Sequence, residues 1–376
     1  MRILALVDRW SRGGVPTVIA NHQKMVTDAG GEYRLYCYYA PDPDAPPMPE
    51  WVTHGEARFR GDPKTIFQFY RLLKTFQPDV IHDHFGGFWS AFYLLRPGWA
   101  KRSLLHYHNE YIPVEETPDQ NRAGRDRLFF RFLMPRYAKI LTVSDHNRQR
   151  IIKYAGIDKE NVQTLPNSID PQQYQRVSDQ QTSIHETFDI PRDAFVVGTH
   201  GRLVYEKGID TTVEVVAELI KREQDRPVWG LISGSGDIHY EAGLKEHVER
   251  LGISDRIIFT GYRSDIPDIL AAMDLFLMPS RQEPFGLTIL EAMAMRVPVV
   301  AVQPEQGGGP LEIIDHQNNG VLIPKRDPKI IADACLEILN YKSYGKQLSD
   351  QAYEDLKRFH PEKIGSALLQ IYRAYC

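Results

Sequence analysis

The sequence predicts an α/β protein made of two parallel β-sheets, each covered by helices on both faces. Short apolar runs alternate with amphipathic helical stretches along the 376 residues. A polar segment without strand character interrupts this alternation, which restarts at Phe195. Strands separated by helices pair in parallel, and parallel sheets are covered on both faces. We therefore expect two Rossmann-like halves that face a cleft, with ligands beyond the carboxyl ends of the strands.

The first half is predicted from four apolar runs and the helical segments between them. The expected strands are Ile3–Val7, Val80–Ile81, Ser103–His106 and Ile140–Val143. Helices are expected at Thr17–Val26 and Thr65–Phe76. In the second of these, apolar residues recur at helical spacing, which is typical of a helix with one buried face.

The second half begins after a polar break between Pro171 and Pro191. Its expected strands are Ala194–Gly198, Trp229–Ser233, Ile257–Thr260, Leu275–Met278, Val297–Val300 and Gly320–Ile323. A helix is expected at Thr211–Lys221 and a last one from Pro361 to Tyr375. A surface loop is the alternative interpretation of the polar break, but the restart of the alternation favours an interdomain linker.

Composition excludes several classes of protein. A formal net charge of −4 gives no global case for nucleic-acid binding. Three widely spaced cysteines favour neither a disulfide framework nor a zinc site. The N-terminal apolar run Ile3–Val7 is too short for a signal peptide, and no stretch approaches the length of a membrane span. We expect a cytoplasmic protein.

The segment Glu283–Glu291 is the most informative part of the chain, because it holds two carboxylates eight positions apart. Glu283 lies in a Pro-Gly turn, and Glu291 lies in an apolar run that predicts a helix. A glutamate inside such a run is costly to bury without a partner. At about 1.5 Å per helical residue, eight residues span roughly 12 Å. This reach fits a nucleotide-sugar, with hexose hydroxyls at one end and ribose hydroxyls at the other.

The start of this helix also suits an anion. The backbone N–H groups of Phe285, Gly286 and Leu287 would point toward a diphosphate lying between the two sugars. The alternative is a capped helix in which Glu291 is paired with a core arginine. The segment resembles the paired-glutamate motif of the retaining GT-B glycosyltransferases of family 4, and the resemblance extends over nearly the whole chain.

The resemblance implies domain bounds and site roles. The N-terminal, acceptor-binding domain would span residues 1–178 and be completed by a C-terminal helix, 361–376, that crosses back onto it. The nucleotide-sugar-binding domain would span 190–358. Glu283 would orient the transferred sugar and Glu291 would hold the ribose. The nucleotide-sugar is a co-substrate, and no cofactor is expected.

Two cations follow a buried strand in Gly201–Gly208, namely Arg202 and Lys207. Fixed cations stabilise the negative charge that develops on a departing nucleoside diphosphate, and so favour the transition state over the ground state. This would replace the Mg²⁺ that other transferases use. A surface salt bridge with Glu206 is the alternative, but the resemblance identifies the two cations as the pair that binds the diphosphate.

Four histidines cluster around two predicted strand ends: His82, His84, His106 and His108. Their spacings match no familiar ligand set, and the family's reaction needs no metal, so we expect no metal site. We expect His82 and His106 to be core histidines that hydrogen-bond to backbone. His108 matches the family's cleft histidine, which hydrogen-bonds the transferred sugar near its reacting carbon.

Glycine turns complete the expected donor site. Gly13 and Gly14 stand between the first strand and its helix, and Gly234 begins a Gly-Ser-Gly turn after another strand. Plain turns explain such glycines about as well. The resemblance places Gly13 and Gly14 beside the donor phosphate and the acceptor, and the turn at Gly234 would let the donor approach the end of its strand. Tyr262 and Arg263 lie in a turn that resembles the family's base-binding turn. Backbone groups would contact the base there, so the sequence leaves the base unspecified.

A basic, aromatic segment spans residues 121–139, with Arg131 and Arg136 among its cations and Phe132 among its rings. One interpretation is a peripheral membrane surface, with arginines on lipid phosphates and rings at the interface. The other is an ordinary helix with a solvated basic face and a buried aromatic face. The sequence leaves both open.

The preferred function is transfer of a hexose from a nucleotide-sugar to a saccharide or a lipid-linked saccharide, with retention and without a metal. The protein would act in surface polysaccharide or glycan biosynthesis, in the cytoplasm or at the inner face of the membrane. One alternative is a non-catalytic binding protein of the same fold. Another is a nucleotide-sugar epimerase. A Rossmann dehydrogenase is not favoured, because the pattern G-x-G-x-x-G is absent.

Overall fold

The computed structural model describes residues 1–109, 128–175, 184–223 and 225–376. The chain divides into two compact units, Met1–Ser168 with Pro361–Cys376, and Ile169–His360. Each unit contains one parallel sheet with helices on both faces, so the predicted fold class is confirmed. The first unit ends at Ser168 in this division. The bounds 178 and 190–358 stay predictions, and part of the expected linker, residues 176–183, lies outside the described residues.

The first unit has a seven-stranded sheet in the order β3-β2-β1-β4-β5-β6-β7. Its strands are β1 (Arg2–Val7), β2 (Glu32–Cys37), β3 (Val52–His54), β4 (Val80–Asp83), β5 (Ser103–Tyr107), β6 (Lys139–Thr142) and β7 (Val162–Thr164). The sequence did not predict β2, β3 and β7. β2 carries Glu32 and Arg34 on its exposed face, which dilutes its apolar signal. The other two are only three residues long.

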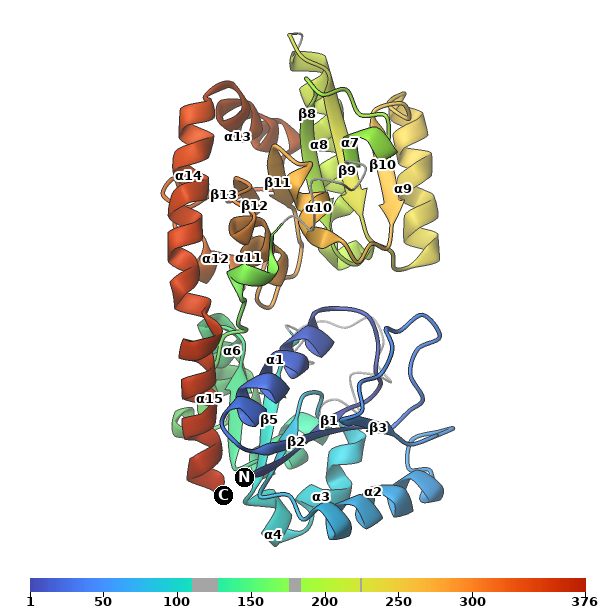
Figure 1. Ribbon diagram of the computed structural model, residues 1–376, viewed down its shortest axis with the longest axis vertical. Coiled ribbons are helices and arrows are strands. Elements are labelled where there is room, and N and C mark those ends of the chain that lie inside the picture. The colour runs from blue at the N-terminus through green and yellow to red at the C-terminus, as the bar shows by residue number, and fades with distance from the viewer. Residues whose placement is uncertain (110–127, 176–183, 224) are drawn as a thin grey trace. The chain divides into compact units, whose positions relative to one another are not determined.

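Helices cover both faces of this sheet (Figure 1). They are α1 (Gly14–Asp28), α2 (Pro63–Phe76), α3 (Ala91–Leu94), α4 (Pro97–Ala100), α6 (Asp145–Ala155) and α15 (Pro361–Tyr375). Because strand side chains alternate in direction, Leu4 and Leu6 pack in one core cluster with Phe69 of α2. Ile3 packs in the opposite cluster, with Ile19 of α1 and the apolar face of α15.

Helix α15 lies beside α1, although the two are at opposite ends of the chain (Figure 1). Gly365 allows the close approach, since a Cβ atom there would lie 3.0 Å from Cγ of Met25. The C-terminal helix therefore belongs to the core of the first unit. Among the described helices of the whole chain, none is long and apolar enough to cross a bilayer.

The second unit has a six-stranded sheet in the order β10-β9-β8-β11-β12-β13. Its strands are β8 (Phe195–His200), β9 (Val228–Ser233), β10 (Ile257–Gly261), β11 (Leu275–Met278), β12 (Val299–Val302) and β13 (Val321–Ile323). The longer helices are α8 (Ile209–Arg222), α9 (Ile238–Leu251), α13 (Pro328–Asn340) and α14 (Lys342–Asp355). The shorter ones are α7 (Ile184–Thr187), α10 (Ile266–Ala271), α11 (Leu287–Ala294) and α12 (Pro310–Ile313).

This strand order contains a switch point. From β8 the chain proceeds outward through β9 to β10, and it then returns to the other side of β8 and proceeds through β11 to β13. The connections that leave the carboxyl ends of β8 and β11 therefore diverge. Open α/β sheets bind ligands in the crevice formed at such a point, so the loops after β8 and β11 are the place to look for a site.

Candidate functional site

Two ionisable pairs join the loop after β8 to the segment after β11. Lys207 Nζ donates to Glu283 Oε2 at 2.5 Å. His200, the last residue of β8, lies with Nε2 2.5 Å from Oε2 of Glu291. Both pairs span the switch point of the second unit. The structure brings Lys207, one of the two cations that the sequence singled out, into contact with Glu283, and it pairs Glu291 with His200.

The Glu283 side chain is buried and hydrogen-bonded. Only 6% of its surface is exposed, and Ser280 Oγ donates to its carboxylate at 3.3 Å in addition to Lys207. The two loops are fixed to each other nearby, because Arg281 binds both carboxylate oxygens of Asp210, at 2.8 and 2.6 Å. A buried carboxylate with a cation and a hydroxyl at hand is suited to accept hydrogen bonds from a polar ligand.

Glu291 is paired, but not with the core arginine that the alternative interpretation proposed. Its Oε1 accepts a hydrogen bond from the Tyr174 hydroxyl at 3.0 Å, while its Oε2 meets His200. Burial and the neighbouring carboxylate raise the pKa of Tyr174. Sequence analysis missed both partners. His200 had a usable signal, since a polar residue ends a buried strand there, whereas Tyr174 comes from a polar stretch without pattern.

The glycine turn at Gly234 is required by packing. A Cβ atom on Gly234 would lie 1.8 Å from the carbonyl oxygen of Gly201, and φ is +136°. Two positions on, a Cβ atom on Gly236 would lie 2.4 Å from the carbonyl oxygen of Leu203. The Leu203 N–H also donates to the Ser235 carbonyl at 3.1 Å. The loops after β8 and β9 thus run against each other, which explains these glycines without a ligand.

Helix α11 begins where the sequence places its start. Gly286, with φ of +108°, precedes Leu287, and Phe285 is buried. The glycine-rich loop after β12 lies against this turn, because the Gly309 N–H donates to the Glu283 carbonyl at 3.1 Å. A Cβ atom on Gly309 would lie 2.0 Å from the Phe285 carbonyl oxygen. Whether the N–H groups of this turn bind a diphosphate stays a prediction.

The remaining second-unit candidates are exposed or engaged locally. Arg202 is exposed, and within the described residues its guanidinium has no ion pair. Two nitrogens of the Arg263 guanidinium bind the two carboxylate oxygens of Asp265. This pairing raises the pKa of Arg263 and fixes the turn after β10. The Tyr262 side chain is 46% exposed. The base-binding role of this turn stays a prediction.

Gly13, Gly14 and His108 belong to the first unit. Gly13 has φ of +128° and immediately precedes α1, so the backbone itself requires glycine there. His108 follows β5, with Nε2 3.0 Å from Nδ1 of His84. Burial lowers the pKa of His108 to about 3, so its ring is neutral at neutral pH.

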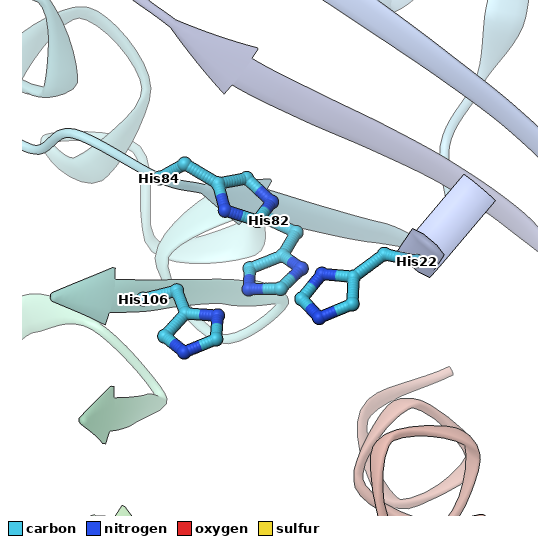
Figure 2. Close-up of side chains that lie close together, drawn as sticks. All are labelled: His22, His82, His84 and His106. Carbon is cyan, nitrogen blue, oxygen red and sulfur yellow. The ribbon is translucent and has the colours of Figure 1, made fainter. Parts of the chain in front are cut away.

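The histidine cluster differs from expectation in its hydrogen bonds. His82 Nδ1 meets the Tyr372 hydroxyl at 2.6 Å and not the backbone. The backbone of Leu165 lies beside the His106 ring, as expected, but neither ring nitrogen of His106 makes a hydrogen bond of normal geometry among the described residues. The structure adds His22 of α1, which sequence analysis missed (Figure 2). Its signal was its place on the buried helix face, four residues after Val18 and four before Val26.

The described part of the basic segment fits the second interpretation only in part. Residues 110–127 lie outside the described residues. Phe129–Leu133 forms a π-helical turn whose Phe129 and Phe130 are buried in the first-unit core. Leu128 and Phe132 are 58% and 57% exposed. Membrane contact stays a prediction.

Two family models match the chain, one for each half. Residues 12–173 match the model described as glycosyltransferase family 4, and residues 180–355 match the model described as glycosyl transferases group 1. Together they span almost the whole sequence, in agreement with the resemblance of the Glu283–Glu291 motif.

Individual relatives match over different lengths. The lipopolysaccharide core biosynthesis mannosyltransferase LpsB of Rhizobium meliloti is 38% identical over 150 residues, which cover 38% of this chain and 41% of the relative. A D-inositol 3-phosphate glycosyltransferase of Corynebacterium urealyticum is 28% identical over 311 residues, covering 79% and 71%. The chain thus spans about two fifths of the first of these curated relatives and most of the second.

Solved structures agree on the fold. Anabaena HepE in complex with UDP and glucose superposes with a TM-score of 0.81 at 20% identity, over 100% of both chains. WaaG, a glycosyltransferase involved in lipopolysaccharide biosynthesis, gives 0.75 at 18% identity, over 98% of this chain and 99% of that one. At these identities the similarity shows the fold alone, a parallel-sheet domain in each half of the chain.

Proposed function

Since the chain belongs to the family 4 glycosyltransferases of GT-B fold, we propose that it transfers a hexose, with retention, from a nucleotide-sugar to a hydroxyl of a saccharide or lipid-linked saccharide. The observation that carries this proposal is the arrangement at the switch point of the second unit. Lys207, in the loop after β8, pairs with Glu283, in the loop after β11. His200, at the end of β8, pairs with Glu291 of α11.

Each pair suits one end of the donor. Glu283, buried and fixed by Ser280, would accept hydrogen bonds from hexose hydroxyls. Glu291 would accept from the ribose hydroxyls. Both assignments rest on the general preference of ionised carboxylates for hydroxyl donors, and on the separation of the two residues along the chain.

The cations suit the diphosphate. Lys207 lies in the same loop as Arg202, whose charge has no carboxylate partner in the described parts of the chain. An uncompensated guanidinium and a neighbouring ammonium would stabilise the negative charge that appears on the nucleotide as the glycosidic bond breaks. The leaving phosphate would accept the proton of the acceptor hydroxyl on the same face of the sugar. No carboxylate is then needed as a nucleophile, and this geometry gives retention.

The relatives support the class of acceptor. LpsB and WaaG are named for lipopolysaccharide biosynthesis, and HepE was crystallised with UDP-glucose. We propose a saccharide acceptor in surface glycan synthesis at the cytoplasmic face of the membrane. The exposed Leu128 and Phe132 beside Arg131 and Arg136 support peripheral contact with anionic lipid.

Two experiments test the proposal in order. A panel of UDP- and GDP-sugars is screened for thermal stabilisation, because a ligand that binds only the folded state raises its stability. The stabilising donor is then incubated with and without saccharide acceptors, and products are identified by mass spectrometry and anomeric NMR. A retained anomeric linkage is the expected result. Conversion of the donor to another sugar without acceptor would identify an epimerase, and binding without turnover would identify a non-catalytic binding protein.

A further inference from the structure

We propose that His22, His82, His84 and His106 form a buried binding site for a single divalent transition-metal ion in the core of the first unit. Each of these side chains offers one ring nitrogen, and the four nitrogens all lie within 4.8 Å of one another (Figure 2). The site lies in the first unit, and the inference does not depend on the proposed transferase activity.

The topology explains why the four side chains converge. Residues two apart on a strand point to the same face of the sheet. His82 lies in β4, and His84 directly follows the strand and still bonds to β1 through its backbone N–H, so the two side chains lie on the same side of the sheet. β5 pairs directly with β4, with Leu104 opposite His82, and His106 extends from the same face two residues beyond Leu104. This is the face that α1 and α15 cover, and α1 supplies His22.

The burial of these rings is unusual for so many polar groups. The four side chains are between 0% and 2% exposed. Nitrogens of all four rings lack a hydrogen-bond partner within the described ranges, namely His22 Nδ1, His82 Nε2, His84 Nε2 and both nitrogens of His106. A buried polar atom without a partner has lost the hydrogen bonds to water that it makes in the unfolded chain, and this destabilises the folded state. A bound cation would satisfy four such atoms at once.

The spacing of most ring pairs is close to what coordination requires. In tetrahedral coordination, nitrogens about 2.0–2.1 Å from one zinc ion lie about 3.3–3.4 Å apart, which places the ring centres about 5.1–5.3 Å apart. The centroids of the His22, His82 and His106 rings are 5.5, 5.6 and 5.4 Å apart, and their planes lie within 14° of one another. His84 is 5.5 Å from His22 and 5.6 Å from His106. The ring of His84 lies only 4.2 Å from that of His82, so one of these two rings has to shift for both to bind one ion.

Hydrogen bonds to the ring nitrogens that face away from the ion can fix the tautomers of His82 and His84 so that the other nitrogen is free to bind metal. If Nδ1–H of His82 donates to the Tyr372 hydroxyl, at 2.6 Å, a lone pair is left on Nε2. If Nδ1–H of His84 donates to Nε2 of His108, at 3.0 Å, a lone pair is left on Nε2 of His84. Metal-bound histidines commonly donate their other N–H group in this way. The arrangement would also connect the ion to His108.

The chemistry of the donor set indicates the class of metal. Four neutral imidazoles and no carboxylate suit Zn²⁺, Cu²⁺ or Ni²⁺ over Mg²⁺ or Ca²⁺, which prefer oxygen ligands. The ion would tie α1 to β4 and β5, and would therefore be structural.

The test uses the untagged full-length protein. It is dialysed against metal-free buffer, supplied with Zn²⁺ or Co²⁺, passed through a desalting column and analysed by elemental mass spectrometry. The expected result is about one ion per chain, with visible Co²⁺ absorption typical of nitrogen coordination and a thermal midpoint that a chelator lowers. Wild-type protein with neither retained metal nor Co²⁺ absorption would overturn the proposal, and this outcome does not depend on any variant.

Variants locate the ion. His106→Gln and His22→Gln should lose retained metal and the Co²⁺ spectrum, whereas His239→Gln, on the exposed surface of α9, should keep both. Tyr372→Phe should weaken binding by about 10–100-fold, as removal of outer hydrogen bonds does at other metal sites. Full retention of metal in both cluster variants would place the ion elsewhere and also overturn the proposal.

Discussion

The Tyr174 hydroxyl donates to Glu291 Oε1 at 3.0 Å, although the two residues are 117 positions apart. The other oxygen of the same carboxylate faces His200. The carboxylate that we assign to the ribose therefore already accepts a hydrogen bond from a hydroxyl of this chain.

Tyr174→Phe removes that hydroxyl and leaves the ring. We expect the affinity for the matching nucleoside diphosphate to rise by about 2–10-fold, since the net value of one such hydrogen bond is about 0.5–1.5 kcal/mol. Isothermal titration calorimetry with the nucleotide measures it. Weaker binding would mean that Tyr174 holds Glu291 in its binding orientation and does not compete with the ligand.

The role of the Lys207–Glu283 pair can be tested with a variant that keeps the shape of the Glu283 side chain. Glu283→Gln keeps the size of the side chain but removes the charge that accepts hydroxyl donors and faces Lys207. We expect transfer to fall by about 100-fold or more, a loss in the range seen when one electrostatic catalytic contact is removed, with the fold intact by circular dichroism. Glu206→Gln, exposed in the same loop as Lys207, is the matched control. Equal activity of the two variants would exclude the role assigned to Glu283.

The contact between Gly234 and Gly201 predicts a large steric effect. A methyl group at Gly234 would overlap the Gly201 carbonyl oxygen at 1.8 Å in a left-handed backbone conformation. We expect Gly234→Ala to lower the free energy of unfolding by about 3 kcal/mol or more, within the range of overpacking and backbone strain. Gly243→Ala, on α9 with open space around it, should instead raise this free energy by about 0.5–1 kcal/mol. Urea denaturation compares them.

Asp8 gives the stability of the fold a pH dependence. Burial raises its pKa from 3.8 to about 7; Asp83 adds to this, while Arg60 and Arg9 oppose it. Between those two values the folded state binds more protons than the unfolded state, so this residue's contribution to stability falls as pH rises from about 4 to about 7.

Asp8→Asn should remove this part of the slope. The variant should gain stability over the wild type as pH rises, up to a limit of about 4 kcal/mol at pH 8 that follows from a shift of about three units. Urea denaturation at pH 5 and pH 8 measures the difference. Parallel pH profiles of the two proteins would contradict the assignment to Asp8.

The candidate site residues could be predicted because each one stands out against its close neighbours in the sequence. Glu283 and Glu291 stand out as charges beside a turn and within an apolar run, and Lys207 stands out as a cation after a buried strand. Each of these signals depends on neighbours within about ten residues. The same locality explains the misses: β3 and β7 are too short to show a period, and Tyr174 lies in a stretch without one.

By itself, the sequence determined the alternation of strands and helices and the place where the second half restarts. It also singled out the candidate residues for a nucleotide-sugar site, because hydrophobic period and residue chemistry are local properties. Only the tertiary structure decided which of these groups meet. Lys207 contacts Glu283 across 76 positions, and His82 contacts Tyr372 across 290. Strand order and helix packing bring such distant residues together, and neither can be read from the spacing of residues along the chain.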